Sequence, residues 1–131
     1  MKQGIGQIAI VVDDYDKAID FYTTKLNFSL LENTILSETK RWVVVAPAGS
    51  ERCALLLAKA ANAEQKSRVG NQTGGRVFLF LYTDNFNRDY ESFKSKGVNF
   101  VREKVIEKWG TVAVFEDLYG NLWDLIEPSP N

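Results

Sequence analysis

Asp124 stands in a run of apolar residues that otherwise looks like a buried strand, Leu122-Trp-Asp-Leu-Ile. A carboxylate buried there without a partner is strongly destabilising, so we expect it to find a hydrogen-bond donor. One interpretation is functional: Asp124 orients or deprotonates a ligand, with its pKa raised by apolar walls. The other is a purely structural hydrogen bond. The sequence leaves both open.

A second group of candidate residues is aromatic. Phe78, Phe80 and Tyr82 alternate along one expected strand, so they should point to the same face. They would form a wall suited to a flat or apolar ligand, although simple core packing gives the same pattern. Trp42 and Trp109 begin later strands, where either could cover a pocket or pack against a dimer partner.

The composition excludes several kinds of site. The chain has no histidine, which rules out a Ser-His-Asp triad, a Cys–His pair and any metal held by imidazole within it. The single cysteine, Cys53, begins an apolar stretch, and we expect a buried structural thiol rather than a nucleophile.

Charge and hydropathy limit the kinds of partner that the chain can have. Sixteen basic and 17 acidic residues leave a net charge of −1, with no basic stripe, which argues against nucleic acid and anionic membranes. No signal peptide and no apolar run of membrane-spanning length stands out in the sequence. We therefore expect a cytoplasmic protein.

The second half of the chain repeats the plan of the first. A strand and a helix in residues 7–22 return 71 positions later in residues 78–93, so that Asp13 is matched by Asp84 and Tyr15 by Phe86. A duplicated unit builds a pseudo-symmetric structure, and equivalent positions of its halves converge on the cleft between them. That cleft is where we expect the chemistry.

Hydrophobic periodicity and turn residues predict one α+β domain made of two β-α-β-β-β modules. Module one covers 1–59, a linker 60–75 and module two 76–131. The linker is expected to hold a short helix at 61–67 and a flexible Gly-rich end rather than a phosphate loop. The expected strands are 5–12, 26–36, 41–46, 53–58, 76–83, 99–106, 111–116 and 122–127, with helices at 14–25 and 86–96.

Three motifs then point to a family. The ending Phe115-Glu-Asp-Leu-Tyr-Gly-Asn-Leu-Trp-Asp-Leu-Ile-Glu is similar to F-x-D-P-x-G-N-x-x-E-L-x-E, and the segment from Asp13 to Phe28 is similar to D-x-x-x-A-x-x-F-Y-x-x-x-L-G-F. Trp109-Gly110 ahead of Phe115 also fits. In this order they resemble the vicinal oxygen chelate superfamily, the group of glyoxalase I, bleomycin-resistance proteins and extradiol dioxygenases.

The resemblance implies a cup-shaped mixed sheet with the helices outside, and in many members a metal at its centre. One side chain on the first strand and one on the last strand of each module would hold that metal. These positions fall on Gln7, Leu56, Phe78 and Asp124. Only Gln7 and Asp124 offer oxygen ligands, fewer than a catalytic metal needs, so we expect no metal and no other cofactor. Gln7 is the expected donor to Asp124.

The leading hypothesis is therefore a small-molecule binding protein of the bleomycin-resistance type, working as a homodimer. Its ligand would be apolar or aromatic, and its catalytic residues, if any, are unknown. The alternatives are a glyoxalase-like lyase or isomerase, or a dioxygenase relative, with a degenerate metal site, and an interaction module whose cup is filled by its own side chains. The expected ligand-binding residues are Gln7, Asp124, Phe78, Leu56, Phe80, Tyr82 and Trp109.

Overall fold

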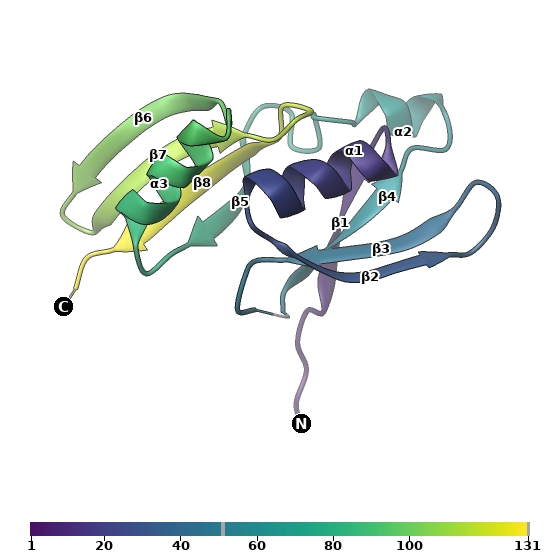
Figure 1. Cartoon of the computed structure of the whole chain (residues 1–131), viewed down its shortest axis with the longest axis horizontal. Coiled ribbons are helices and arrows are strands. Elements are labelled where there is room, and N and C mark those ends of the chain that lie inside the picture. The colour runs from purple at the N-terminus through teal and green to yellow at the C-terminus, as the bar shows by residue number, and fades with distance from the viewer. Residues whose placement is uncertain (51, 131) are drawn as a thin grey trace. The chain divides into compact units, whose positions relative to one another are not determined.

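The computed structural model describes residues 1–50 and 52–130, and the chain divides into two compact units, Met1–Val69 and Gly70–Asn131. The boundary falls inside the segment 60–75 that we expected to link two modules. Each unit has the order β-α-β-β-β, which confirms the predicted α+β class with two tandem modules. The elements of each unit are labelled in Figure 1.

Unit one contains β1 (Gln7–Val12), α1 (Tyr15–Asp20), the π-helical turn η1 (Phe21–Lys25), β2 (Ser29–Ile35), β3 (Arg41–Ala46), β4 (Ala54–Lys59) and α2 (Ala63–Ser67). Unit two contains β5 (Val77–Tyr82), α3 (Phe86–Ser95), β6 (Phe100–Glu107), β7 (Gly110–Glu116) and β8 (Leu122–Pro128). The four strands of each unit form one mixed sheet, in the orders β1-β4-β3-β2 and β5-β8-β7-β6. In both sheets the first strand runs parallel to the last, and the other pairs are antiparallel.

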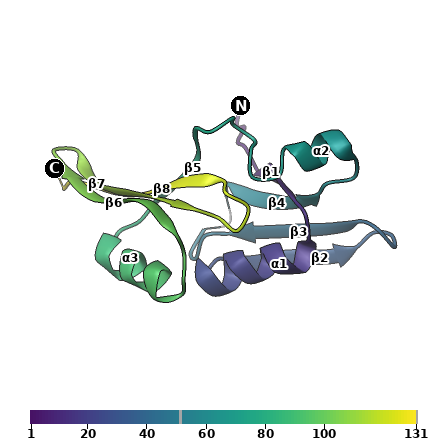
Figure 2. The ribbon, with the colours of Figure 1, turned by 90° about the horizontal axis from the view of Figure 1, so that it is seen from above.

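The first helix starts as the sequence predicts. Asp14 caps it by accepting a hydrogen bond from the Lys17 N–H at 2.9 Å. The expected single helix to Lys25 instead changes to the π-helical turn, whose last backbone bond runs from the Leu26 N–H to the Phe21 carbonyl at 3.3 Å. The helix covers one face of the sheet of unit one, as Figure 2 shows. The fully buried strand side chains include Ile10, Val12, Val43, Val45 and Leu57, and Tyr22 is buried from the π-helical turn.

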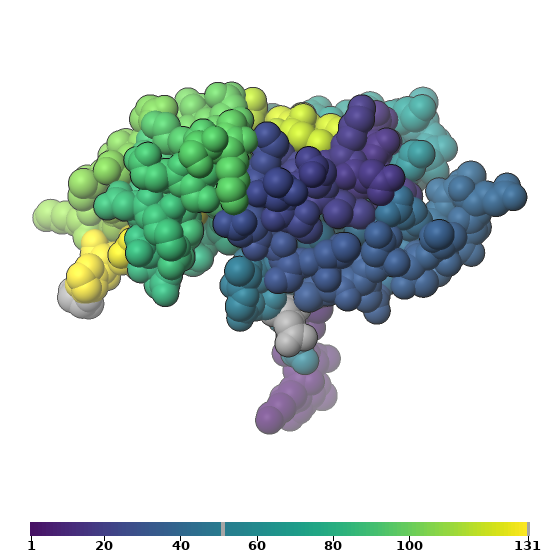
Figure 3. Space-filling model, viewed as in Figure 1, coloured from purple at the N-terminus to yellow at the C-terminus, as the bar shows by residue number. Residues whose placement is uncertain are grey.

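The surface of α1 runs directly into that of the β2–β3 pair, where the dark and mid-blue atoms meet in Figure 3. An ion pair crosses this boundary, because the Arg41 guanidinium lies 3.1 Å from the Asp16 carboxylate. Arg41 also donates hydrogen bonds to the Asn33 side chain on β2. Arg41 therefore joins the helix to the outer strands.

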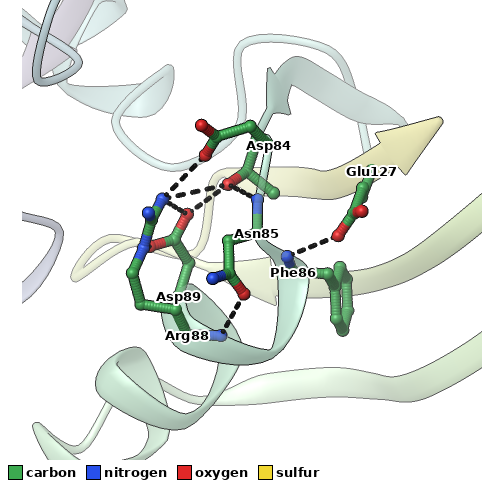
Figure 4. Close-up of polar contacts among 7 residues, drawn as sticks. Asp84, Asn85, Phe86, Arg88, Asp89 and Glu127 are labelled. Carbon is green, nitrogen blue, oxygen red and sulfur yellow. Dashed lines mark hydrogen bonds and ion pairs between the residues drawn. The ribbon is translucent and has the colours of Figure 1, made fainter.

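In unit two, α3 packs by aromatic side chains. Phe93 meets Phe115 edge-on at 5.4 Å, and Phe115 stacks on Trp123 at 5.7 Å between ring centroids. Asn85 caps the helix through the Arg88 N–H, and Glu127 of β8 accepts from the Phe86 N–H (Figure 4). Gly97 follows the helix at φ +86°, the left-handed conformation in which glycine commonly ends a helix.

A buried turn connects β7 to β8. Asp117 accepts hydrogen bonds from the backbone N–H groups of Tyr119 and Asn121 at 2.9 Å, and from the Asn121 side chain at the same distance. Gly120 takes φ +99° within it. The Asp and Gly-Asn of the C-terminal motif thus build the turn that brings β8 back beside β7.

One prediction for unit one is wrong. Cys53 is exposed, and β4 begins one residue later at Ala54. The apolar residues that follow Cys53 belong to the strand, whereas Cys53 itself still lies in the preceding loop. Hydrophobicity of the neighbours was therefore a poor guide to the burial of this thiol.

Candidate functional site

Each helix covers one face of its sheet, and the registers identify the side chains on the other face. Across unit two, Phe80, Asp124, Val114 and Arg102 are partners in neighbouring strands. Across unit one, the corresponding row is Ala9, Leu56, Val44 and Glu32. Register partners project to the same face of a sheet. Leu56 is therefore the counterpart of Asp124, an apolar group in one unit where the other has a carboxylate.

The row in unit two lines a hollow of about 460 Å³. Phe80, Val114 and Leu122 supply apolar walls, and the charged lining residues are Arg76, Arg102 and Asp124. Burial raises the pKa of the half-buried Asp124 carboxyl, and the positive charge of Arg102 opposes this in part. The hollow thus presents a poorly solvated carboxylate beside an aromatic ring.

Two aromatic side chains of β5 stand open to solvent. Phe80 is 56% exposed and Tyr82 is 64% exposed, and they alternate on the same strand. Core packing, the alternative interpretation of this pattern, does not hold for these two residues. They form an aromatic strip next to Asp124, the register partner of Phe80.

Phe78 lies differently from the other two. The register of β5 against β8 shifts between Val77 and Leu79, so Phe78 falls at a bulge and is half-buried. Val77 is the partner of Leu122 and lines the hollow, whereas Phe78 is absent from its lining. The bulge therefore displaces Phe78 from the position that simple alternation predicts.

The remaining predicted site residues lie elsewhere. Gln7 is exposed on β1 as the partner of Ala54, two positions before the row of Leu56. It belongs to unit one and Asp124 to unit two, so their hydrogen bond stays a prediction. Leu56 packs with Trp42 against a small buried cluster on this face of unit one, made of Val44, Ala46 and Ala54. Trp109 is 55% exposed at the turn between β6 and β7.

The donor set does not fit a catalytic metal. Of the four positions that hold a metal in many vicinal oxygen chelate proteins, unit one supplies only the Gln7 amide and unit two only the Asp124 carboxylate. Within residues 1–50 and 52–130, no group of three or more Cys, Asp or Glu side chains is placed to bind an ion.

Some residues that line the hollow were not predicted from the sequence. Arg102, Val101 and Val114 belong to the hollow, but β6 contains two register shifts, so the inward face of that strand cannot be counted by alternation. Val114 could have been found, because it lies in a regular strand opposite Asp124.

The comparisons with known proteins agree with this architecture. The family model "Glyoxalase/Bleomycin resistance protein/Dioxygenase superfamily" matches residues 4–125. The chain belongs to this superfamily. An uncharacterized protein of Shewanella frigidimarina (strain NCIMB 400) is 59% identical over 128 residues, covering 97% of this chain and 95% of the relative.

Two solved structures of the superfamily fold are also similar. The crystal structure of UcmS2 has a TM-score of 0.84 and 30% identity, covering 96% of this chain and 98% of that one. TnmS3, an antibiotic binding protein from Streptomyces sp. CB03234, has a TM-score of 0.80 and 29% identity, covering 98% of both chains. In the part of the chain that the structure describes, no helix is long and apolar enough to cross a membrane.

Proposed function

We propose that this superfamily member binds a small apolar or aromatic molecule on the uncovered faces of its sheets, without the usual catalytic metal. The observation that carries the proposal is the half-buried Asp124 beside the exposed ring of Phe80 in the hollow of unit two. The similarity to an antibiotic binding protein supports the same class of ligand.

The aromatic side chains and the carboxylate contribute to ligand recognition in different ways. A flat ligand that covers Phe80 and Tyr82 removes their apolar surface from water, at about 25 cal/mol per Å². Asp124 accepts a hydrogen bond from an amine, amide or hydroxyl of the ligand, and partial burial of the carboxylate strengthens this contact. A role for Gln7 as a further polar anchor stays a prediction. Binding of this kind sequesters a molecule and needs no nucleophile.

The test is a calorimetric binding titration with bleomycin and with the planar cation 9-aminoacridine. Replacing Asp124 by Asn should weaken 9-aminoacridine about tenfold or more, since it removes a charge-assisted contact. Phe80→Ala should weaken it about threefold to tenfold, through lost stacking. The matched controls are Glu107→Gln and Ile106→Ala, which change an exposed carboxylate and an exposed apolar group on β6 that are not in the lining of the hollow.

Equal affinities in all four variants would refute the proposed site. A thermal-shift screen with divalent metals provides the second arm, because a ligand of the folded state raises Tm. A large rise with a metal, abolished by chelation, would favour the lyase, isomerase or dioxygenase alternative. The homodimer and the cytoplasmic location stay predictions, and sedimentation velocity tests the first.

A further inference from the structure

Strand β6 places two neighbouring side chains on the same face of its sheet. Phe100 contacts α3, because its ring meets the Tyr90 ring edge-on at 4.7 Å between centroids. Glu103 also faces α3, where its carboxylate accepts a hydrogen bond from the Tyr90 hydroxyl. Between them, Val101 and Arg102 both line the hollow on the uncovered face. Neighbouring side chains of a regular strand point to opposite faces, so this stretch of β6 is bulged.

The register places an irregularity on each side of Arg102. Arg102 is the partner of Val114, and the register of β6 against β7 shifts both before and after this pair. In unit one, Glu32 has the corresponding position in its row, and the register of β2 against β3 shifts only before it, between Leu30 and Glu32. Of these two strand pairs, the one in unit two therefore has an additional shift, and this shift follows Arg102.

Tyr90 acts at the additional shift. The Lys104 N–H, which lies within it, donates to the Tyr90 hydroxyl at 3.2 Å. That hydroxyl donates in turn to the Glu103 carboxylate. The residue 71 positions earlier is Ile19, which has no hydroxyl, and the corresponding strand of unit one stays in register after its first shift. Tyr90 therefore satisfies and holds the irregular backbone that follows Arg102.

The hollow that Arg102 lines has a net positive charge. Its charged lining residues are Arg76, Arg102 and Asp124, two cations and one carboxylate. Among the residues that the structure describes, no ion pair involves any of these three. Arg102 and Asp124 belong to one row with Val114 between them, so their backbones lie two strand spacings apart, about 9–10 Å. A ligand that reaches both needs an acidic oxygen at one end and a hydrogen-bond donor at the other.

We propose that the hollow of unit two binds a planar aromatic acid with a hydrogen-bond donor at its far end, that Arg102 binds the acid, and that Tyr90 is the positioning residue for Arg102. Asp124 accepts the donor, and the aromatic body lies on Phe80. This ligand class rests on the proposed function, because it concerns the same hollow. The role of Tyr90 does not need a ligand, because Tyr90 also sets the distance between the charges of Arg102 and Asp124.

Calorimetric titration of the full chain compares 6-hydroxy-2-naphthoate with its neutral isostere 6-hydroxy-2-naphthamide. The acid should bind more tightly than the amide, and Arg102→Ala should weaken the acid about tenfold while changing the amide less than about twofold. Arg102→Lys should recover part of the loss, because it restores the charge but not the bidentate geometry. The matched control is Lys108→Ala, which removes the same charge from an exposed position of unit two outside the lining of the hollow and should leave both affinities unchanged.

Tyr90→Phe tests the positioning role, because it removes the hydroxyl and keeps the ring against Phe100. It should weaken the acid about threefold to tenfold but not the amide, and it should have no further effect once Arg102 is replaced by alanine. It should also raise the pKa of Asp124, followed by carboxyl carbon shifts without ligand. The reason is that the positive charge of Arg102, which opposes the effect of burial on this pKa, moves away.

The matched control for Tyr90 is Tyr15→Phe, which removes a helix hydroxyl that accepts a strand N–H in unit one, that of Arg41 at 3.1 Å. It should change neither the two affinities nor the pKa of Asp124. A purely structural role for Tyr90 would weaken both probes alike and leave that pKa unchanged. This result, equal binding of the two probes, or the same effect from both Tyr→Phe variants would overturn the inference.

The probe 9-aminoacridine separates this inference from the proposed function. If 9-aminoacridine binds at Asp124 and the acid does not, the inference is wrong and the proposed function holds. If none of the three molecules binds, the proposed function is wrong as well.

Discussion

The Glu127 carboxylate on β8 accepts a hydrogen bond from the Phe86 N–H at 2.6 Å, so the last strand holds the first residue of α3 (Figure 4). The free N–H groups at a helix start make this a favourable place for a carboxylate. The corresponding residue of unit one is Lys59, which cannot accept a hydrogen bond. At this position, unit one therefore cannot hold its helix start in the same way.

Replacing Glu127 by Ala should lower the free energy of unfolding by about 1 kcal/mol, the usual effect of losing a helix cap. Glu127→Gln should cost less, because an amide oxygen still accepts the Phe86 N–H. Urea denaturation followed by circular dichroism measures both changes. Glu107→Ala, an exposed carboxylate on β6, is the control and should have little effect. Equal losses from the Ala and Gln variants would show that charge, rather than the hydrogen bond, stabilises the helix start.

Two glycines before β5 should respond differently to the same change. Gly70 has φ +74° and Gly74 has φ +68°, so alanine at either adopts a left-handed conformation, at about 1–2 kcal/mol. A Cβ on Gly70 would also lie 1.8 Å from the Tyr119 carbonyl oxygen, whereas nothing lies within 4 Å of one on Gly74. We expect Gly70→Ala to destabilise by about 1–3 kcal/mol more than Gly74→Ala. Thermal denaturation compares them, and equal melting temperatures would contradict the close backbone approach.

The stability of the protein should depend on pH through Asp124. Its pKa is raised in the folded state by burial, against the smaller effect of Arg102, so the folded chain binds this proton more tightly than the unfolded chain. Ionisation of Asp124 therefore lowers the free energy of unfolding as the pH rises from the ordinary pKa of 3.8 through the raised pKa of the folded state. Asp124→Asn removes that cost.

We expect the stability gained by Asp124→Asn, relative to the unmodified chain, to grow across this pH window and to level off above it. Urea denaturation at steps between about pH 3 and about pH 8 gives the curve. Arg102→Ala should widen the window, because the opposing positive charge is lost. A gain that is constant with pH, or that shrinks as pH rises, would mean that Asp124 is not poorly solvated in the folded state.

The exposed Cys53 thiol should react with an aromatic disulfide reagent in the native protein as fast as it does in urea. Cys53→Ser should change the free energy of unfolding by less than about 0.5 kcal/mol, as for other surface substitutions. Stopped-flow absorbance follows the reaction. A thiol that reacts only after unfolding would mean that Cys53 is buried in the folded protein.

The regular parts of the fold could be predicted because their signals are local. A continuous run of apolar residues marks β3 at Arg41–Ala46, which matches the expected strand, and Asp14 marks the helix start. The second strand was expected from Leu26 but begins at Ser29, because Leu26 still has a helical backbone conformation and Asn27 takes a left-handed φ of 62°.

The candidate site was only partly predictable. Alternation placed Phe80 and Tyr82 together beside Asp124, since a regular strand repeats every two residues. The bulge at Phe78 and the register shifts around Arg102 leave no trace in composition, because they depend on how one strand pairs with the next.

The sequence by itself determined the two modules and their order of elements, because hydrophobic period and helix caps are properties of the chain. Only the tertiary structure decided that Cys53 is exposed and that Val77 takes the place expected for Phe78. It also decided that the part of β3 before Val44 is not paired with β4. The physical reason is that burial and register arise from pairing between distant segments. Tyr15 can accept the Arg41 N–H only after the helix and the strand have met.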